Sequence, residues 1–319
     1  MTTSEADFHT HGWRQALLMR CRGIAPVATA VVHPCDAVAL GAAVEAAALG
    51  LITPILVGPE AKIRAAARDA GADISAFRLE ATSHSHAAAA RGVALVRACE
   101  AQVLMKGSLH TDELMHEVMA PDTGLRTGRR ISHVYIMDVP RYPRPLLITD
   151  AAINIAPSLE DKRDIVQNAV DLAHVLGLTC PRVAILSAVE TVTSKLPSTL
   201  DAAALCKMAD RGQITGAVLD GPLAFDNAVS PEAAREKGLA SAVAGQADLL
   251  VVPDLVSGNI LAKQLTFLAG ADAAGVVVGA RVPIILTSRA DSEAARIASC
   301  AVAVLMAHAM ATATSGPPN

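Results

Sequence analysis

The stretch DLLVVPDLVSGNILAKQ, residues 248–264, has the pattern of a strand followed by a loop and a helix start. Its apolar, β-branched run 249–252 is typical of a buried strand, which Pro253 ends because proline has no N–H for the ladder. The segment Ser257-Gly258-Asn259 then leads into helical spacing. Glycine permits close approach of the backbone to a ligand, and the first N–H groups of a helix lack internal partners. The stretch therefore predicts an anion site at a helix start.

A second segment of the same kind follows. Residues 282–286 (VPIIL) form a buried-strand run, Thr287-Ser288-Arg289 is expected to turn, and 291–311 has the composition of a long, Ala-rich helix. A hydroxyl and a guanidinium at a helix start suit a phosphate group. The alternative is that Ser257 and Ser288 only cap their helices, since serine is a preferred N-cap residue.

The rest of the chain repeats this alternation of strand and helix. After an expected polar, helical arm up to about Ile24, strand-like runs occur at 27–32, 52–58, 102–105, 133–137, 217–219 and 273–279, and 182–190 has the pattern of a strand and a turn. Segments with helical character begin near residues 36, 59, 83, 111, 158 and 199. Such alternation predicts an α/β fold with parallel-type sheets flanked by helices, and with ligands at the carboxyl ends of the strands.

Composition excludes several classes of protein. The 319 residues include 52% hydrophobic but only 2% aromatic residues, and the net charge is −4. Few aromatic rings and a weakly acidic balance argue against a nucleic-acid surface. No uninterrupted apolar run reaches the length of a membrane span, and the N-terminus lacks the pattern of a signal peptide. Six scattered cysteines without a CxxC pair indicate reduced thiols in a cytoplasmic protein.

Common cofactor motifs are missing, and one stretch is strongly basic. The chain has no GxGxxG, GxxxxGK or GxSxG sequence, and Ala120 occupies the position where an HExxH zinc motif starting at His116 needs its second histidine. The segment 124–145 (GLRTGRRISHVYIMDVPRYPRP) carries five arginines. It is either a solvated face or a funnel for an anionic substrate.

Six segments together resemble the phosphate acetyltransferases and phosphate butyryltransferases, and they follow the order found in that family. They are LMKGSLHTDELMH (104–116), GLRTGRRISHV (124–134), ITDAAINIAPSLEDKRDI (148–165), LDGPLAFDNAVS (219–230), VVPDLVSGNILAKQL (251–265) and ILTSRADS (285–292). The fourth and the sixth segments look closer to the butyryl-type branch.

The resemblance implies an architecture like that of the isocitrate and isopropylmalate dehydrogenases, with the active site in the cleft between two α/β domains. The expected domains are 1–149 plus 282–319 and 150–281. The boundary near Thr149 follows the restart of the alternation, and the return near Val282 follows the resemblance. The implied reaction is reversible transfer of a short acyl group (acetyl, propionyl or butyryl) between CoA and phosphate in a ternary complex, by a homodimer or larger assembly. CoA is a substrate there, and neither a metal nor a nicotinamide is needed.

The resemblance also assigns candidate residues. Ser288 and Arg289 match a Ser-Arg pair that is thought to stabilise the transition state and to bind substrate anions, and Ser257, Gly258 and Asn259 match the loop after the Pro-Asp strand. Further candidates for phosphate or CoA are Lys106, Arg129, Arg130 and Asp226. The alternative for Lys106 is a solvated lysine at the end of a strand, and the alternative for Asp226 is a helix cap. Asp254 is expected to orient its loop by accepting from N–H groups.

One departure from the family pattern concerns the base that deprotonates the CoA thiol. Acetyl-type members carry an aspartate in the first turns of the last helix, where this chain has Ala295. Asp291 and Glu293 face other directions on a helix, so deprotonation by solvent or phosphate stays open. Two other functions are considered: a non-catalytic sensor of CoA or acyl phosphate, and a metal- and NAD-dependent decarboxylating dehydrogenase, for which no cluster of aspartates is evident.

Overall fold

The computed structural model describes residues 12–286 and 291–314, and the chain divides into two compact units. One, here the central unit, is Arg130–Ala273; the other, the terminal unit, is Arg14–Arg129 together with the chain from Ala274 onward. The expected limits were 149/150 and 281/282. The first differs because the strand β5 (Ser132–Asp138) pairs antiparallel with β6 (Leu146–Thr149), and both strands therefore belong to the central unit.

The terminal unit contains strands in the order β3-β2-β1-β4-β11-β10. Their bounds are Val27–Val32 (β1), Ile52–Gly58 (β2), Arg78–Ala81 (β3), Val103–Lys106 (β4), Ile284–Ile285 (β11) and Asp272–Val278 (β10). Neighbours pair in parallel, except that Val277 of β10 pairs antiparallel with Ile284. The chain runs from β1 to β2 and β3 on one side and then to β4 on the other, so it changes direction between β1 and β4.

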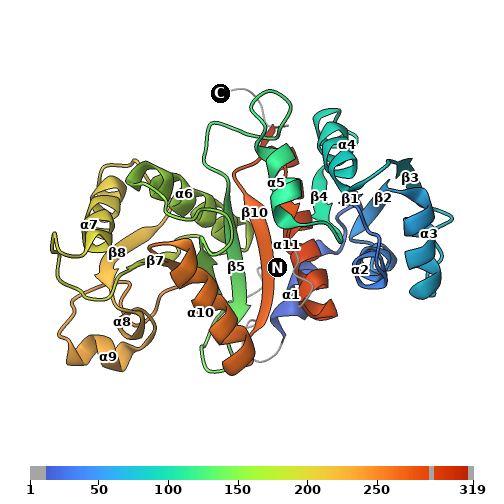
Figure 1. Ribbon diagram of the computed structural model, residues 1–319. Helices are drawn as coiled ribbons and strands as arrows, with labels where there is room; N and C mark the ends of the chain where they lie inside the picture. The colour runs from blue at the N-terminus through green and yellow to red at the C-terminus, as the bar shows by residue number, and fades with distance from the viewer. Residues whose placement is uncertain (1–11, 287–290, 315–319) are drawn as a thin grey trace. The chain divides into compact units, whose positions relative to one another are not determined.

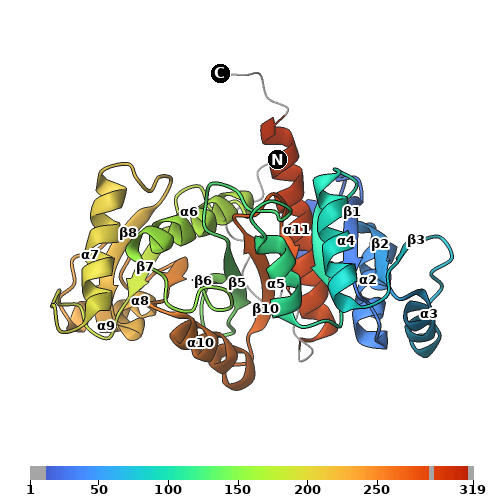
Figure 2. The same ribbon diagram turned by 45° about the horizontal axis from the view of Figure 1, so that its top comes forward.

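In the described part of this unit, six helices accompany the strands: α1 (Trp13–Cys21), α2 (Ala37–Ala48), α3 (Glu60–Asp69), α4 (Ser85–Arg97), α5 (Thr111–Met119) and α11 (Glu293–Thr314). Helices α4 and α5 lie side by side, and α2 packs against α3 and α11 (Figure 2). The N-terminal segment is helical as expected, but it is not simply a polar arm, because Trp13 and Leu17 of α1 are buried. Among the helices that the structure describes, α11 alone is long and apolar enough to cross a membrane, but 61% of its apolar window is buried, as in a core helix.

The central unit has the strand order β5-β6-β9-β7-β8, in which all neighbours except β5 and β6 are parallel. The remaining strands are β7 (Arg182–Leu186), β8 (Val218–Leu223) and β9 (Leu249–Val251), and the helices are α6 (Leu159–Val175), α7 (Pro197–Asp210), α8 (Phe225–Val229), α9 (Pro231–Glu236) and α10 (Leu255–Leu268). Helices α6 and α10 both pack on β5 and β6, from opposite sides (Figure 1).

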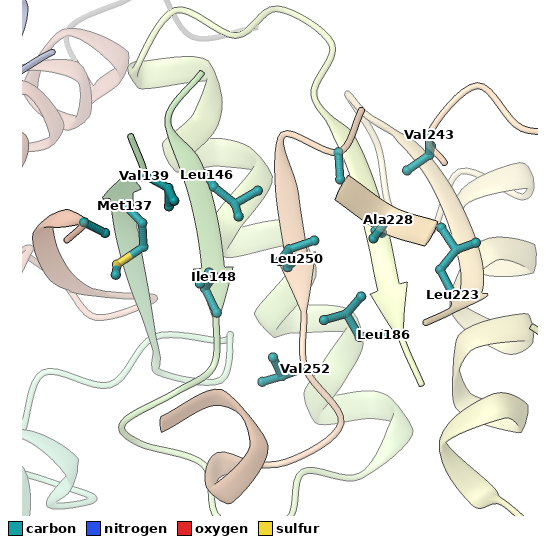
Figure 3. Packing of buried hydrophobic residues seen from close by; sticks show 13 residues of the cluster. Met137, Val139, Leu146, Ile148, Leu186, Leu223, Ala228, Val243, Leu250 and Val252 are labelled. Carbon is teal, nitrogen blue, oxygen red and sulfur yellow. The ribbon is translucent and has the colours of Figure 1, made fainter. Parts of the chain in front are cut away.

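Alternate residues of the central strands build the core of this unit. Met137, Ile148, Leu250 and Leu186 come from four strands and belong to one buried cluster (Figure 3). Side chains of a strand alternate between its two faces, so every second residue points to the same face. Even a short strand can therefore contribute two side chains to the cluster. The prediction of an α/β fold with mostly parallel sheets and flanking helices is confirmed.

Candidate active site

The carboxyl ends of β6 and β9 meet at the point where the chain of the central unit changes direction. The chain passes from β6 to β7 and β8 and only then returns to place β9 between β6 and β7. Such a switch point is where open α/β sheets bind ligands. Asp150 follows β6 and α10 follows β9, and the N–H of Leu255 donates to the carbonyl of Ile155 at 3.1 Å.

The start of α10 lies earlier than the sequence suggests. Asp254 is the N-cap, and its Oδ1 accepts from both the N–H and the hydroxyl of Ser257, each at 2.8 Å. The helix therefore begins at Leu255, and Ser257, Gly258 and Asn259 lie within it and not in a loop. The expectation that Asp254 orients this segment through N–H groups is confirmed, and Ser257 is not the cap.

This capping uses most of the donors that the anion site was expected to offer. The N–H groups of Leu255, Ser257 and Gly258 donate to the Ile155 carbonyl, the Asp254 carboxylate and the Asp254 carbonyl, respectively. Helix-start N–H groups bind anions only when they lack such partners. What the start of α10 can offer a ligand is thus chiefly its side chains.

Gly258 allows α10 to approach the loop after β6. A Cβ at this position would lie 2.7 Å from Cγ2 of Val252 and 3.0 Å from the carbonyl oxygen of Asp150. The neighbouring Asn259 donates from Nδ2 to the carbonyl of Ala151 at 3.3 Å. The close approach expected of this glycine is therefore made to the protein's own backbone.

Asp150 is the centre of that loop, a role that no sequence pattern predicted. Its carboxylate is buried and accepts from the N–H groups of Ala152 (2.9 Å), Ile153 (3.0 Å) and Asn154 (3.2 Å) and from Asn154 Nδ2 (2.6 Å). Burial raises the pKa of Asp150, while these donors oppose the shift. The buried carboxyl thus fixes the conformation of residues 150–154.

Arg130 is joined to Asp150 through Asn154. Its Nε donates to Asn154 Oδ1 at 2.7 Å, and its Nη1 lies 3.4 Å from the carboxylate of Asp161. The side chain is still 49% exposed, so the guanidinium is positioned and also accessible. Such a preordered fork suits a phosphate group. Arg129, by contrast, lies in an exposed turn where its N–H donates to Thr127 Oγ1 at 3.1 Å.

Lys106 is the last residue of β4 and is buried. Its Nζ donates to the carbonyls of Gly107 and Leu109, both at 3.2 Å. It therefore holds the loop between β4 and α5, and it is not the solvated strand-end lysine considered as an alternative. Met105 pairs with Ile285 of β11, after which the chain continues to Ser288 and Arg289; both of these residues lie outside the described residues.

Asp226 is not brought next to the start of α10 within the central unit. It is an exposed residue in the first turn of α8 and follows β8, which is separated from β9 by β7. The alternative that Asp226 caps a helix is not what the structure shows either, since Ala224 is the N-cap of α8 and Ser230 that of α9. In the part of the chain that the structure describes, no group of three His, Cys, Asp or Glu side chains could hold a metal ion.

Comparison with known proteins gives consistent results. Residues 80–304 match the family model described as "Phosphate acetyl/butaryl transferase". A "Phosphate acetyltransferase" of Rhizobium meliloti is 66% identical over 291 residues, 91% of this chain and 92% of that protein. A "Phosphate butyryltransferase" of Clostridium acetobutylicum is 42% identical, over 88% of this chain and 93% of that protein. The crystal structure of a branched-chain phosphotransacylase from Enterococcus faecalis V583 aligns with a TM-score of 0.77 at 31% identity, covering 88% of this chain and 99% of that one.

Proposed function

Since the chain belongs to the phosphate acetyl/butyryl transferase family, we propose that acetyl is the preferred one among the short acyl groups it transfers. It is an acyltransferase that interconverts acyl-CoA plus phosphate with acyl phosphate plus CoA. The observation that supports acetyl is the 66% identity to a protein named phosphate acetyltransferase, against 42% to one named phosphate butyryltransferase. This outweighs the likeness of two short motifs to the butyryl-type branch.

The chemistry asks three things of the site. In the direction of acyl-CoA formation the thiol of CoA loses its proton, the sulfur attacks the carbonyl carbon, and the C–O bond to phosphate breaks. The protein must hold the phosphate, stabilise the oxyanion and accept the thiol proton. We assign the first task to Arg130 and Arg289, since Arg130 is accessible and held by Asn154 and Asp161. Ser288 is proposed to donate to the oxyanion.

The side chains of Ser257 and Asn259, on the first turns of α10, are proposed to contribute to binding of phosphate or CoA. Asn259 and Gly258 contact the loop of Asp150, which in turn orders Asn154 beside Arg130. A change at Gly258 is therefore expected to affect activity through position and not through chemistry. Lys106 is proposed to shape the β4 loop, whereas the exposed residues Arg129 and Asp226 are proposed to contribute little to binding.

The test is phosphate-dependent release of free CoA from acetyl-, propionyl- and butyryl-CoA, followed with a thiol reagent. The wild type is expected to require phosphate and to favour acetyl-CoA, and Ser288→Ala to lower kcat at least about a hundredfold, as for the loss of an oxyanion donor. A preference for butyryl-CoA would overturn the acyl assignment. CoA binding without turnover of any of the three would favour the sensor. We also propose that no metal or nicotinamide is required, so the rate should be unchanged after chelation and dialysis.

The enzyme is further proposed to be a homodimer that acts in the cytoplasm, which suits six free cysteines. One face of α10 supports a second copy as partner. Val256, Ile260 and Phe267 are 60%, 60% and 70% exposed and lie within about 40° of one another around the helix. Leu268 and Ile155 are exposed beside them. These five side chains are called the α10 face.

The area of the α10 face is sufficient for a dimer. With roughly 150–200 Å² for a fully exposed large side chain, the face presents on the order of 600 Å² per copy. Two copies would then bury about 1,200 Å², the lower limit for stable interfaces. Light scattering after size exclusion should give a dimer for the wild type and a monomer for Ile260→Glu. Leu200→Glu, at an exposed apolar position of α7, is the matched control and should stay dimeric. A monomeric wild type would exclude the homodimer.

A further inference from the structure

The loop after β1 holds a histidine in an uncommon conformation. His33 is partly buried and has φ +55°, a region that non-glycine residues rarely adopt. The loop after β4 holds it there: Ser108 N–H donates to the His33 carbonyl at 2.9 Å and Gly107 N–H to the Val32 carbonyl at 2.8 Å. A Cβ on Gly107 would lie 2.6 Å from the His33 carbonyl oxygen, so only glycine permits this contact. The two loops are thus fixed against each other.

The contacts of Ser108 favour a proton on Nδ1 of His33. Its hydroxyl donates to the His33 carbonyl at 2.8 Å and accepts from the N–H of Cys35 at 3.1 Å. The same oxygen lies 3.4 Å from His33 Nδ1. Because the only hydroxyl hydrogen is already used, Nδ1 must carry a hydrogen to interact favourably with it. The lone pair of a neutral imidazole is then on Nε2.

Nε2 is not sealed off from solvent. It has no hydrogen-bond partner among the described residues and is not one of the buried polar atoms. His33 follows β1 directly, and the chain of the terminal unit changes direction between β1 and β4, which marks a ligand site. Strand β11, which leads to Ser288 and Arg289, is two strands from β1, about 10 Å in the sheet.

The surrounding charges keep this imidazole neutral. Burial lowers the pKa of His33 below its ordinary value of 6.5, and Lys62 of α3 lowers it further. Glu113 of α5, Asp36 at the N-cap of α2 and the carbonyl of His33 itself oppose the shift without reversing it. The neighbouring Cys35 stays a neutral thiol, since burial raises its pKa to about 11. At pH 7 the ring is therefore able to accept a proton.

We propose that Nε2 of His33 is the general base that takes the proton from the CoA thiol, the task for which the position of Ala295 offers no carboxylate. As the S–H bond breaks, its proton passes to Nε2 and its electron pair forms the bond between sulfur and the carbonyl carbon, while the C–O bond to phosphate breaks. In the reverse direction the imidazolium returns the proton to the departing thiolate. The inference rests on the proposed function and adds a catalytic residue to it.

His33→Asn is the variant that tests this role, because asparagine tolerates positive φ and has no basic nitrogen. In acetyl-CoA formation from acetyl phosphate and CoA, kcat is expected to fall about a hundredfold or more, the usual contribution of a general base. The wild-type rate should rise with pH through a midpoint below 6.5, and this acidic limb should vanish in the variant. His86→Asn, at an exposed histidine, is the control and should keep both the wild-type kcat and the acidic limb of the pH profile.

A second variant keeps the test decisive if His33→Asn does not fold. Ser108→Ala removes the group that orients Nδ1, so the acidic limb should shift and kcat should fall while KM for acetyl phosphate stays within about twofold. Added imidazole should restore part of the rate of a folded His33→Gly variant. A wild-type-like kcat and pH profile in His33→Asn would overturn the proposal and leave the acyltransferase function intact, whereas an inactive wild type would instead contradict the function.

Discussion

Single buried polar residues of this enzyme give the clearest physical expectations. His133 on β5 is 1% exposed, its Nδ1 has no partner within the described residues, and its ring contacts Tyr135 edge to face at 4.4 Å between centroids. Burial lowers its pKa to about 3, far below the ordinary 6.5. The side chain is therefore neutral in the folded protein at neutral and mildly acidic pH.

His133 should make stability depend on pH. Between pH 3 and 6.5 the unfolded state binds a proton that the folded state does not, so the free energy of unfolding falls as pH is lowered, by up to about 1.36 kcal/mol per pH unit. Well above pH 6.5 the contribution is constant. His133→Phe keeps the aromatic contact and removes this dependence. Urea unfolding of variant and wild type at pH 7 and pH 5 measures this dependence. The difference between the two proteins is taken because Asp150, whose pKa is raised, makes stability change with pH in the opposite direction in both of them.

On going from pH 7 to pH 5, the free energy of unfolding of the wild type should fall by about 2 kcal/mol relative to that of His133→Phe. His86→Phe, at an exposed histidine, is the control: its free energy of unfolding should differ from that of the wild type by the same amount at both pH values. Equal pH slopes for wild type and His133→Phe would mean that the buried ring can be protonated in the folded state.

At the scale of elements, α10 shows how a helix start is fixed from two sides. Asp254 caps it through Ser257, and Gly258 lets it lie against the loop of Asp150. The glycine is unfavourable within a helix by about 1 kcal/mol relative to alanine, so its presence reflects the close packing.

Gly258→Ala should destabilise the protein by about 1–2 kcal/mol, since overpacking costs roughly 1–3 kcal/mol and alanine regains about 1 kcal/mol of helix propensity. The activity should fall as well, because the loop that orders Asn154 and Arg130 must shift. Gly41→Ala is the matched control: this residue lies within α2, and no atom is within 4 Å of a Cβ placed there. It should stabilise by about 0.5–1 kcal/mol. Denaturant midpoints of both variants check the pair, and a more stable Gly258→Ala would contradict the packing argument.

Some elements escaped prediction because they are short or irregular. Strand β6 has only four residues after the proline-rich stretch 140–145, and β3 (RLEA) has no apolar alternation. Their extended conformation comes from pairing with β9 and β5, and with β2, respectively. Long periodic segments were predicted well; β2, for instance, spans Ile52–Gly58 as expected.

At the scale of the whole molecule, each unit depends on contacts between residues far apart in the sequence. In the central unit, Asp248 precedes β9, and Oδ2 and Oδ1 accept from Nε (2.9 Å) and Nη2 (3.0 Å) of Arg182 at the start of β7. Nη1 of Arg144, just before β6, donates to Oδ1 at 3.2 Å. The carboxylate is 5% exposed and joins three neighbouring strands at their amino ends, opposite the site.

Asp248→Asn should lower the free energy of unfolding by about 3 kcal/mol, at the lower end of the range for broken buried pairs, because both arginines are 30% exposed. It should leave KM for the substrates unchanged in the folded protein. Asp210→Asn breaks an exposed pair with Lys207 and serves as the control, without measurable change. Chemical denaturation of the two variants measures the difference in their free energies of unfolding. Equal values would show that the ion pairs of Asp248 between the strands do not stabilise the unit.

The sequence by itself determined the fold class, the family and most of the helices and strands. Periodicity and turn residues are local properties of the chain, and six segments in order are specific to a family. It also identified Asp254 as a residue that orients its neighbours.

Only the tertiary structure decided the chain of contacts from Asp150 through Asn154 to Arg130, the loss of free N–H groups at α10 and the contact between Ser108 and His33. The physical reason is that each depends on which strands are neighbours. Strand β9 lies between β6 and β7, and β4 lies beside β1, although long stretches of chain separate these partners. Hydrogen bonds between such loops follow from strand order, which no local pattern of residues encodes.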